Sequence, residues 1–229
     1  MASFPANSET IENYLKAIHT LAGESPSGEA GMKAVATLVG VTVGTASTMV
    51  KRMAAGRLVK YERFGGVKLT AKGRKIAVDV VRRHRLIELF LVRTLGLDWS
   101  MVHDEAERME HALSPVVLDA LDRFLGRPDI DPHGDPIPDS RGSYKQAALV
   151  PLAAVTAGTR VRVARALDQT ESSLRFLKAN GLAVGALACV EGIEPGAGIV
   201  SVTNAERKRV SLSIQAAGNV LVKTCADRP

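Results

Sequence analysis

The sequence is poor in cysteine and has no long uninterrupted hydrophobic run. Its two cysteines, Cys189 and Cys225, form no metal-spaced pair and are too few for a disulfide framework, so we expect reduced thiols of minor structural importance. No stretch approaches the ~18 to 20 consecutive apolar residues that span a bilayer. The first residues, MASFPANSETIENYL, lack the basic and apolar regions of a signal peptide. These absences predict a cytoplasmic protein that does not act at a membrane.

Charge is distributed unevenly along the chain. The 229 residues are 46% hydrophobic, which allows one or two domains with a substantial core, and their formal net charge is +6. Residues 31–75 contain ten basic side chains and one acidic, Glu62, whereas residues 76–141 contain eight basic and thirteen acidic. A basic block followed by an acidic one indicates a module that binds a polyanion, joined to a segment with another task.

The basic block has the pattern of a helix-turn-helix with a wing. Apolar residues at helical spacing predict a first helix over 8–24, a short second helix over 32–40 that ends at Gly40, and a third over 41–58. The short turn between the second and third helices is typical of a helix-turn-helix. Two β-leaning runs around Gly65 and Gly66 predict a hairpin wing.

The rest of the chain changes from helical to β-rich. A long helix is expected over 70–96, and two further helices over 100–126 with a break near Ser114 and Pro115. Residues 127–142 are dense in Pro, Gly and Asp and form an ordered loop or a linker. Short β-rich runs follow, among them TRVRVARAL and KRVSLSIQAAGNVLV, with one helical piece, TESSLRFLKANG. This pattern suggests a small barrel.

The second helix of a helix-turn-helix enters the major groove of DNA. Its first turns here carry small side chains that can meet base edges, namely Thr42, Gly44, Thr45, Ser47 and Thr48. Lys33, Lys51 and Arg52, together with Lys60, Arg63 and Lys68 of the wing, are placed to meet phosphates. Phosphate contacts are therefore expected to carry most of the affinity for double-stranded DNA. The alternative is a winged-helix domain that contacts proteins, with lysines that only make it soluble.

The acidic block contains a helix, VHDEAERMEHAL, whose side chains suit a metal ion. His103, Glu107, Glu110 and His111 fall within about a third of the helix circumference. Imidazole and carboxylate ligands together suit first-row metals such as manganese, iron or zinc. His84 and Glu88 form a second pair, four residues apart on the preceding long helix. The alternative is a solvated helix face with surface ion pairs. His19 and His133 have no such neighbours in the sequence and are expected to be structural.

Several of these segments together resemble one known family. ENYLKAI, the winged helix-turn-helix, RRHRLIELFL, VHDEAERMEH and HGDPIP look like the metal-dependent repressors of the diphtheria-toxin-repressor family, including its manganese-transport regulators. The likeness runs over about Glu9 to Asp139. The C-terminal part resembles the SH3-like (FeoA-like) domain of longer members, best at FLKANGLAVGA.

The resemblance implies a fold class and a domain organisation. The fold would be mainly α, with a winged helix-turn-helix DNA-binding domain over 1–75, a helical metal-binding and dimerisation domain over 76–141, and a small SH3-like (FeoA-like) β-barrel over 148–225. The protein would form a homodimer that binds divalent metal and then operator DNA upstream of metal-transport genes.

The resemblance also implies two metal sites. His84, Glu88 and His103 match the family's ancillary site, which the SH3-like domain completes. There the chain departs, because aligning FLKANG places Arg165 where a carboxylate ligand is common and Asp168 at the next ligand position. The primary site matches at Glu107, Glu110 and His111, and Asn13 on the first helix stands at the position of a further ligand. Iron-sensing members carry cysteine at the position of Glu107 and manganese-sensing members a carboxylate, and at Asn13 the family uses methionine or aspartate.

We therefore expect a manganese- or iron-responsive transcriptional repressor without enzymatic activity or a small-molecule substrate. Mn²⁺ is the preferred ion, Fe²⁺ is the alternative, and other divalent transition metals can substitute. Two other interpretations are a metal-independent winged-helix regulator and a metallohydrolase, since His/Glu-bound metals also activate water. Against the hydrolase, the helix lacks the His-Glu-x-x-His order and no separate base is evident.

Overall fold

The computed structural model describes residues 9–61, 65–145 and 147–225. Arg63, expected to meet phosphate, lies outside these residues. The chain forms two compact units: Met1–His84, Arg108–Pro115 and Pro138–Ser143 make the first, and Arg85–Glu107, Val116–Ile137 and Tyr144–Pro229 make the second. The boundary crosses two helices, α4 (Ala71–Arg93) and α5 (Val102–Met109). Among the described residues no single helix is long and apolar enough to span a membrane, and the helices Met32–Leu38 and Val43–Ala55 meet that composition only as a pair bent by 104°.

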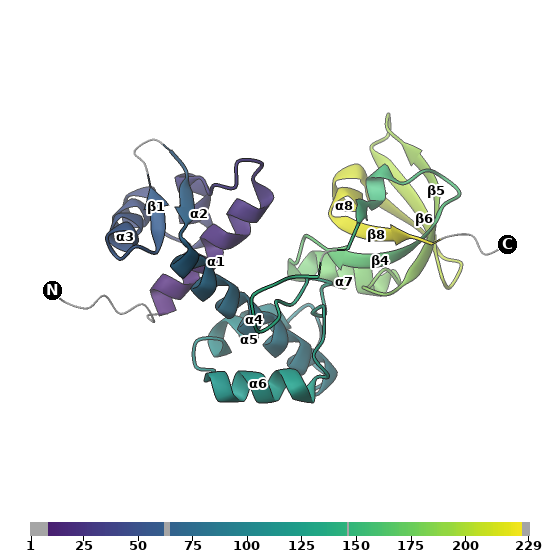
Figure 1. Cartoon of the computed structure of the whole chain (residues 1–229). Coiled ribbons are helices and arrows are strands. Elements are labelled where there is room, and N and C mark those ends of the chain that lie inside the picture. The colour runs from purple at the N-terminus through teal and green to yellow at the C-terminus, as the bar shows by residue number, and fades with distance from the viewer. Residues whose placement is uncertain (1–8, 62–64, 146, 226–229) are drawn as a thin grey trace. The chain divides into compact units, whose positions relative to one another are not determined.

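The first unit contains the expected helix-turn-helix. It is built from α1 (Glu9–Glu24), α2 (Met32–Leu38) and α3 (Val43–Ala55), which are labelled in Figure 1. Gly40 adopts a φ of +72° in the turn, a value that favours glycine, and Thr42 caps α3 by accepting a hydrogen bond from the Thr45 amide. Leu15 and Ile18 of α1 share one buried core with Val50 and Met53 of α3. The first helix of the unit therefore shares its hydrophobic core with the helix predicted to read DNA.

The wing is a two-stranded antiparallel hairpin of β1 (Val59–Tyr61) and β2 (Val67–Leu69), with Val59 opposite Leu69. The strand β2 is also tied to the loop after α1, because Ala30 and Val67 exchange backbone hydrogen bonds. Thr70 then starts α4 by accepting a hydrogen bond from the Gly73 amide. The wing is thus anchored at both ends to the helical core.

The second unit combines α6 (Pro115–Phe124) and parts of α4 and α5 with a β-rich region (Figure 1). The region is a six-stranded antiparallel sheet in the order β3-β8-β4-β5-β6-β7, with bulges in the β4–β8 and β5–β6 pairs. Its elements, in chain order, are β3 (Val150–Pro151), the 3-10 turn η1 (Leu152–Ala154), β4 (Arg160–Ala166), α7 (Glu171–Ala179), β5 (Leu187–Glu194), β6 (Ile199–Asn204), β7 (Arg209–Ser213), α8 (Ile214–Gly218) and β8 (Val220–Thr224).

One expectation for this region was incomplete. The run KRVSLSIQAAGNVLV was expected to be β-rich throughout, but a short helix, α8, separates β7 from β8. Ser213 caps this helix by accepting a hydrogen bond from the Ala216 amide, and the two alanines that follow favour a helical turn.

The Pro- and Gly-rich loop is ordered and packs on the sheet. The amide of Ala166 in β4 donates to the carbonyl of His133 at 2.9 Å. Gly134 has a φ of +86°, and a Cβ there would collide with the Ala164 carbonyl. Trp99, from the chain before α5, is buried in the same hydrophobic core as the sheet. These contacts explain why part of the middle segment forms one compact unit with the C-terminal region.

Candidate metal centres

Three segments of the first unit bring their polar side chains together. Lys16 comes from α1, His84 from α4, and Glu110 from the residues that follow α5. The Glu110 side chain is 0% exposed, and its Oε2 lies 2.7 Å from Nδ1 of His84. The Lys16 ammonium donates to Oε1 and Oε2 of Glu110 at 3.0 and 2.9 Å and lies 3.0 Å from the same His84 nitrogen.

His111 is held beside this group in one orientation. Its Nδ1 lies 2.6 Å from Oε2 of Glu12, so the ring donates to that carboxylate. The other nitrogen, Nε2, is buried, has no hydrogen-bond partner among the described residues, and lies 3.6 Å from Oε1 of Glu110. Arg83 donates to both oxygens of Glu12 at 3.3 Å and to the Glu110 carbonyl at 2.8 Å. A carboxylate that fixes one imidazole nitrogen and leaves the other with a lone pair is the usual support of a metal-binding histidine.

Asn13 offers a second ligand atom without a partner. Its Oδ1 is buried and accepts no hydrogen bond within the described part of the chain. A buried amide oxygen left in this state costs free energy unless another group satisfies it. By chemical type, this amide oxygen, Nε2 of His111 and the Glu110 carboxylate are all ligands that suit a first-row divalent ion.

The Glu110 carboxylate is stabilised in its charged form. Burial alone raises its pKa, but the His84 hydrogen bond and the positive charges of Lys16 and His84 outweigh burial, so that the pKa is lower than usual. Glu110 is therefore ionised at neutral pH and available as an anionic ligand.

Glu107, the fourth residue predicted for the primary site, belongs to the second unit. Its side chain on α5 is 37% exposed, and its Oε1 lies 3.7 Å from Nε2 of His103. The two side chains thus form the i, i+4 contact expected from their spacing. Glu107 stands one helical turn before Glu110 in the chain.

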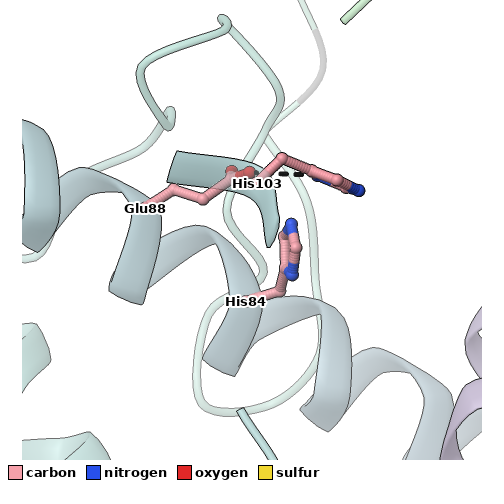
Figure 2. Close-up of side chains that lie close together, drawn as sticks. All are labelled: His84, Glu88 and His103. Carbon is pink, nitrogen blue, oxygen red and sulfur yellow. Dashed lines mark hydrogen bonds and ion pairs between the residues drawn. The ribbon is translucent and has the colours of Figure 1, made fainter. Parts of the chain in front are cut away.

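Another group of possible ligands surrounds Glu88 of α4. Figure 2 shows Glu88 with His84 one turn earlier on the same helix and His103 from α5. Glu88 is 1% exposed, and its Oε1 lies 3.4 Å from Nδ1 of His103. Its other oxygen, Oε2, lies 3.5 Å from Nδ1 of His133. Glu88, Asp131 and His133 are all buried, and one ligand atom of each lies within 4.8 Å of the other two.

His133 was expected to be structural, yet its orientation suits a ligand. Nε2 donates to the Trp99 carbonyl at 2.7 Å, and Nδ1 is buried with no hydrogen-bond partner among the described residues. Burial lowers the pKa of His133, but the negatively charged Glu88, whose Oε2 lies 3.5 Å from Nδ1, dominates and raises it to about 9. Burial, with the negative charges of Glu88 and Asp135, raises the pKa of Asp131 well above its usual value. Protons held by such a cluster are the ones that a metal ion displaces.

The cluster of Glu88, Asp131 and His133 cannot be recognised from the spacing of these residues in the sequence. His133 lies 45 residues after Glu88 in the chain, inside a loop whose Pro and Gly content suggests only a turn. The one available signal was HGDPIP, which carried the family resemblance without a ligand role.

Asp168, the ligand expected from the SH3-like region, contacts the start of α7 in the structure. Its Oδ1 accepts hydrogen bonds from the Thr170 amide and hydroxyl, which fixes the turn that leads into α7. The neighbouring Gln169 reaches the loop instead, donating to Oδ2 of Asp135 at 2.6 Å. Arg165 forms an ion pair with the same Asp135. These two contacts attach the sheet region to the loop that carries His133.

Most of the predicted DNA-binding residues on α2 and α3 are exposed. Lys33, Lys51 and Arg52 are exposed, as are Thr42, Gly44, Thr45 and Thr48, whereas Ser47 is half-buried. Two of the hydroxyls are engaged within the helix. Thr42 accepts from the Thr45 amide, and Thr48 donates to the Gly44 carbonyl at 3.0 Å. The surface therefore offers small groups and backbone to base edges, flanked by cations.

Comparisons with known proteins agree along the whole chain. Family models match residues 7–67 (iron dependent repressor, N-terminal DNA binding domain), 70–139 (iron dependent repressor, metal binding and dimerisation domain) and 150–224 (FeoA domain). The iron-dependent repressor IdeR of Mycobacterium leprae is 36% identical over 163 residues, which cover 68% of this chain and 70% of that protein. The diphtheria toxin repressor of Corynebacterium diphtheriae is 36% identical over 156 residues, covering 67% and 65%.

Solved structures give the same result. A manganese-dependent transcriptional repressor in complex with manganese is similar with a TM-score of 0.85 and 37% identity, over 94% of this chain and 100% of that one. A structure of ScaR with bound Zn²⁺ is similar with a TM-score of 0.76 and 29% identity, over 94% and 99%. The expected fold is thereby confirmed, and the chain belongs to the diphtheria-toxin-repressor family of metal-dependent, DNA-binding transcriptional repressors.

Proposed function

We propose that this chain is a manganese-activated repressor of metal-uptake genes, which binds its operator as a homodimer when a divalent ion occupies a site formed by Asn13, Glu107, Glu110 and His111. The observation that carries the proposal is the state of His111. Glu12 holds its Nδ1, while its buried Nε2 is left without a partner among the described residues and faces Glu110. That is an imidazole prepared to bind a cation.

The choice of manganese rests on the chemistry of the four side chains. Two carboxylates, one amide oxygen and one imidazole nitrogen are hard or intermediate ligands, and no thiolate is among them. Such a set accommodates Mn²⁺, whereas a cysteine at position 107 would favour softer or more tightly bound ions. Fe²⁺ has similar demands and is the second candidate. Raw affinity for other divalent ions follows their general order, so selectivity would come from geometry.

The bound ion would affect DNA binding through the position of α1. Asn13 lies on this helix, whereas Glu110 and His111 lie in the segment after α5. An ion shared by these ligands would fix α1 to that segment, and α1 shares its core with α3, the predicted recognition helix. If the fixed arrangement is the one that fits two successive major grooves, the ion shifts the population of molecules towards the DNA-binding state.

We assign the cluster around Glu88 to a supporting second site. His84, Glu88 and His103 are its ligands by family resemblance, and the buried Asp131 and His133 add two candidates. An ion here would stabilise the attachment of the loop to α4, since Glu88 lies on that helix and His133 in the loop. Asp168 stays the ligand candidate by resemblance, although its contacts with Thr170 favour a structural role.

The proposed dimer surface is α6. Its apolar side chains Val116, Val117 and Phe124 are 78, 52 and 67% exposed, more than a solvated helix of ten residues normally leaves uncovered. A two-fold dimer through this helix would present two recognition helices to two half-sites. Lys33, Lys51 and Arg52 would then contact phosphates, and Thr42, Gly44, Thr45, Ser47 and Thr48 would approach the bases.

A titration of DNA binding against several divalent ions tests this proposal. The metal-stripped protein is first used to select a preferred duplex from a random pool in the presence of Mn²⁺. Binding to that duplex is then measured by fluorescence anisotropy with increasing Mn²⁺, Fe²⁺, Co²⁺ or Zn²⁺. We expect the protein to bind this duplex only when Mn²⁺ is present. Binding should disappear when a chelator removes the ion. Equal binding with and without metal would favour a metal-independent regulator.

A further inference from the structure

The ammonium group of Lys16 occupies the position of a bound cation. It lies within 3.0 Å of three atoms that could coordinate a metal, namely both carboxylate oxygens of Glu110 and Nδ1 of His84. Lysine side chains are usually solvated, but this one is only 16% exposed and its partner Glu110 is 0% exposed. The ammonium is therefore held inside the polar cluster rather than on its surface.

Glu110 lies between two imidazoles, and only one of them is engaged by the lysine. Its Oε2 is 2.7 Å from Nδ1 of His84, next to the Lys16 ammonium. Its Oε1 is 3.6 Å from Nε2 of His111, which has no hydrogen-bond partner within the described residues. One carboxylate thus faces two places for a cation, one beside His111 and one beside His84. Carboxylates commonly bridge two cations in this way, each oxygen serving one of them.

We propose that Lys16 is a tethered cation that permanently fills the place beside His84, so that the cluster accepts a single metal ion, beside His111. The proposal rests on the proposed function above, because it concerns the number of ions at the same site. Because the ammonium is covalently attached to α1, its presence beside Glu110 does not depend on the concentration of free ions. A second divalent ion at Glu110 would have to displace a covalently attached charge and would also face its repulsion.

The account predicts that removing the charge creates a second ion site. Lys16→Met keeps the length of the side chain but has no ammonium, which leaves the Glu110–His84 pair open. Metal-stripped full-length protein is dialysed to equilibrium against Mn²⁺, and bound manganese is counted by elemental analysis. We expect Lys16→Met to bind one additional ion per chain relative to the wild type. Lys223→Met, an exposed lysine of β8, is the control for loss of one charge and should bind the wild-type number.

Electron paramagnetic resonance supplies an independent readout. Two manganese ions that share one carboxylate are magnetically coupled, whereas isolated ions give an uncoupled hyperfine pattern. The wild type should show only the uncoupled signal, and Lys16→Met should gain a coupled one. Lys16→Arg restores the charge and should return both the ion count and the spectrum to those of the wild type. If Lys16→Met does not fold, as judged by circular dichroism, Lys16→Gln takes its place in both measurements.

The outcomes separate this inference from the proposed function. If Glu110→Gln binds one ion fewer than the wild type, the wild type uses the proposed site. If Glu110→Gln binds the wild-type number of ions, both proposals are overturned. If the wild type has that ion and Lys16→Met binds the same number, the inference is overturned alone. If Lys16→Met binds manganese more tightly but in the wild-type number, the inference is also overturned. The ammonium would then compete with the single ion for its own place instead of filling a second place.

Discussion

The Glu12 carboxylate on the first helix lies 2.6 Å from Nδ1 of His111, a residue 99 positions later in the chain. The contact fixes which nitrogen of His111 carries the proton and directs Nε2 towards Glu110. Arg83 holds Glu12 in turn from α4, with contacts of 3.3 Å to both carboxylate oxygens. A helix of the DNA-binding module therefore positions a ligand of the proposed metal site before any ion binds.

Glu12→Ala should weaken manganese binding at the primary site. Loss of a carboxylate that supports a metal-binding histidine typically costs about 10- to 100-fold in metal affinity. Isothermal titration of the metal-stripped variant measures the change, and Glu9→Ala, at the exposed start of α1, is the matched control. Glu12→Gln should lie between the two, since its amide oxygen still accepts a hydrogen bond. Unchanged affinity in Glu12→Ala would remove Glu12 from the support of His111.

Lys51 and Arg52 are predicted to contribute through DNA phosphates. Both are exposed on α3, beside side chains too short for bidentate base contacts. Lys51→Ala or Arg52→Ala should weaken binding to the selected duplex and to random duplex by similar factors. Each should also reduce the slope of log affinity against log salt by about one. A loss confined to the selected duplex would instead make the residue a base reader.

The ion pair of Asp98 with Lys178 predicts a pH effect at the attachment of the sheet region. The Lys178 hydrogen bond, followed by those of Ser100, lowers the pKa of Asp98 far below its usual value. Because the pKa of Asp98 is lower in the folded than in the unfolded protein, its ionised carboxylate stabilises the fold at pH values above the unfolded pKa of 3.8. This stabilisation is lost as the pH falls towards and through the folded-state pKa. Because the pair is partly exposed, we expect less than about 1 kcal/mol.

Urea unfolding at pH 6 and at pH 3 measures this contribution in the metal-free protein. Asp98→Asn should lower the unfolding free energy at pH 6 and have a smaller effect at pH 3. Lys178→Met should produce the same difference, and the double variant should add nothing further. A deficit in Asp98→Asn that is equal at both pH values would assign the effect to packing rather than to charge.

Local signals were sufficient to predict the DNA-binding module. Gly40, expected to end the second helix, lies in the turn, and Thr42 caps α3; both are short-range features of the sequence. The stripe of His103, Glu107, Glu110 and His111 also predicted a polar cluster from helical spacing alone. Helix α5, however, ends at Met109, so Glu110 and His111 follow the helix rather than continuing its face.

The supporting residues could not be predicted, because their contacts join distant segments. Lys16 and Glu110 are separated by 94 residues, and Glu12 and His111 by 99. On the first helix Glu12 and Lys16 read as ordinary polar positions of an amphipathic pattern. The neighbours of His133 could not be predicted for the same reason, since only the packing of its loop on β4 and Trp99 brings it to Glu88. Periodicity reports which face of an element is polar, not which distant residue meets it.

The most direct test of the account is manganese-dependent DNA binding by Glu107→Ala. Glu107 is 37% exposed, so the substitution should leave the fold intact while removing one anionic ligand. Asp104→Ala removes the same charge from an exposed position of the same helix and is the control. We predict that added Mn²⁺ will restore binding to the selected duplex in Asp104→Ala but not in Glu107→Ala. Full manganese-dependent binding by Glu107→Ala would contradict the proposed site.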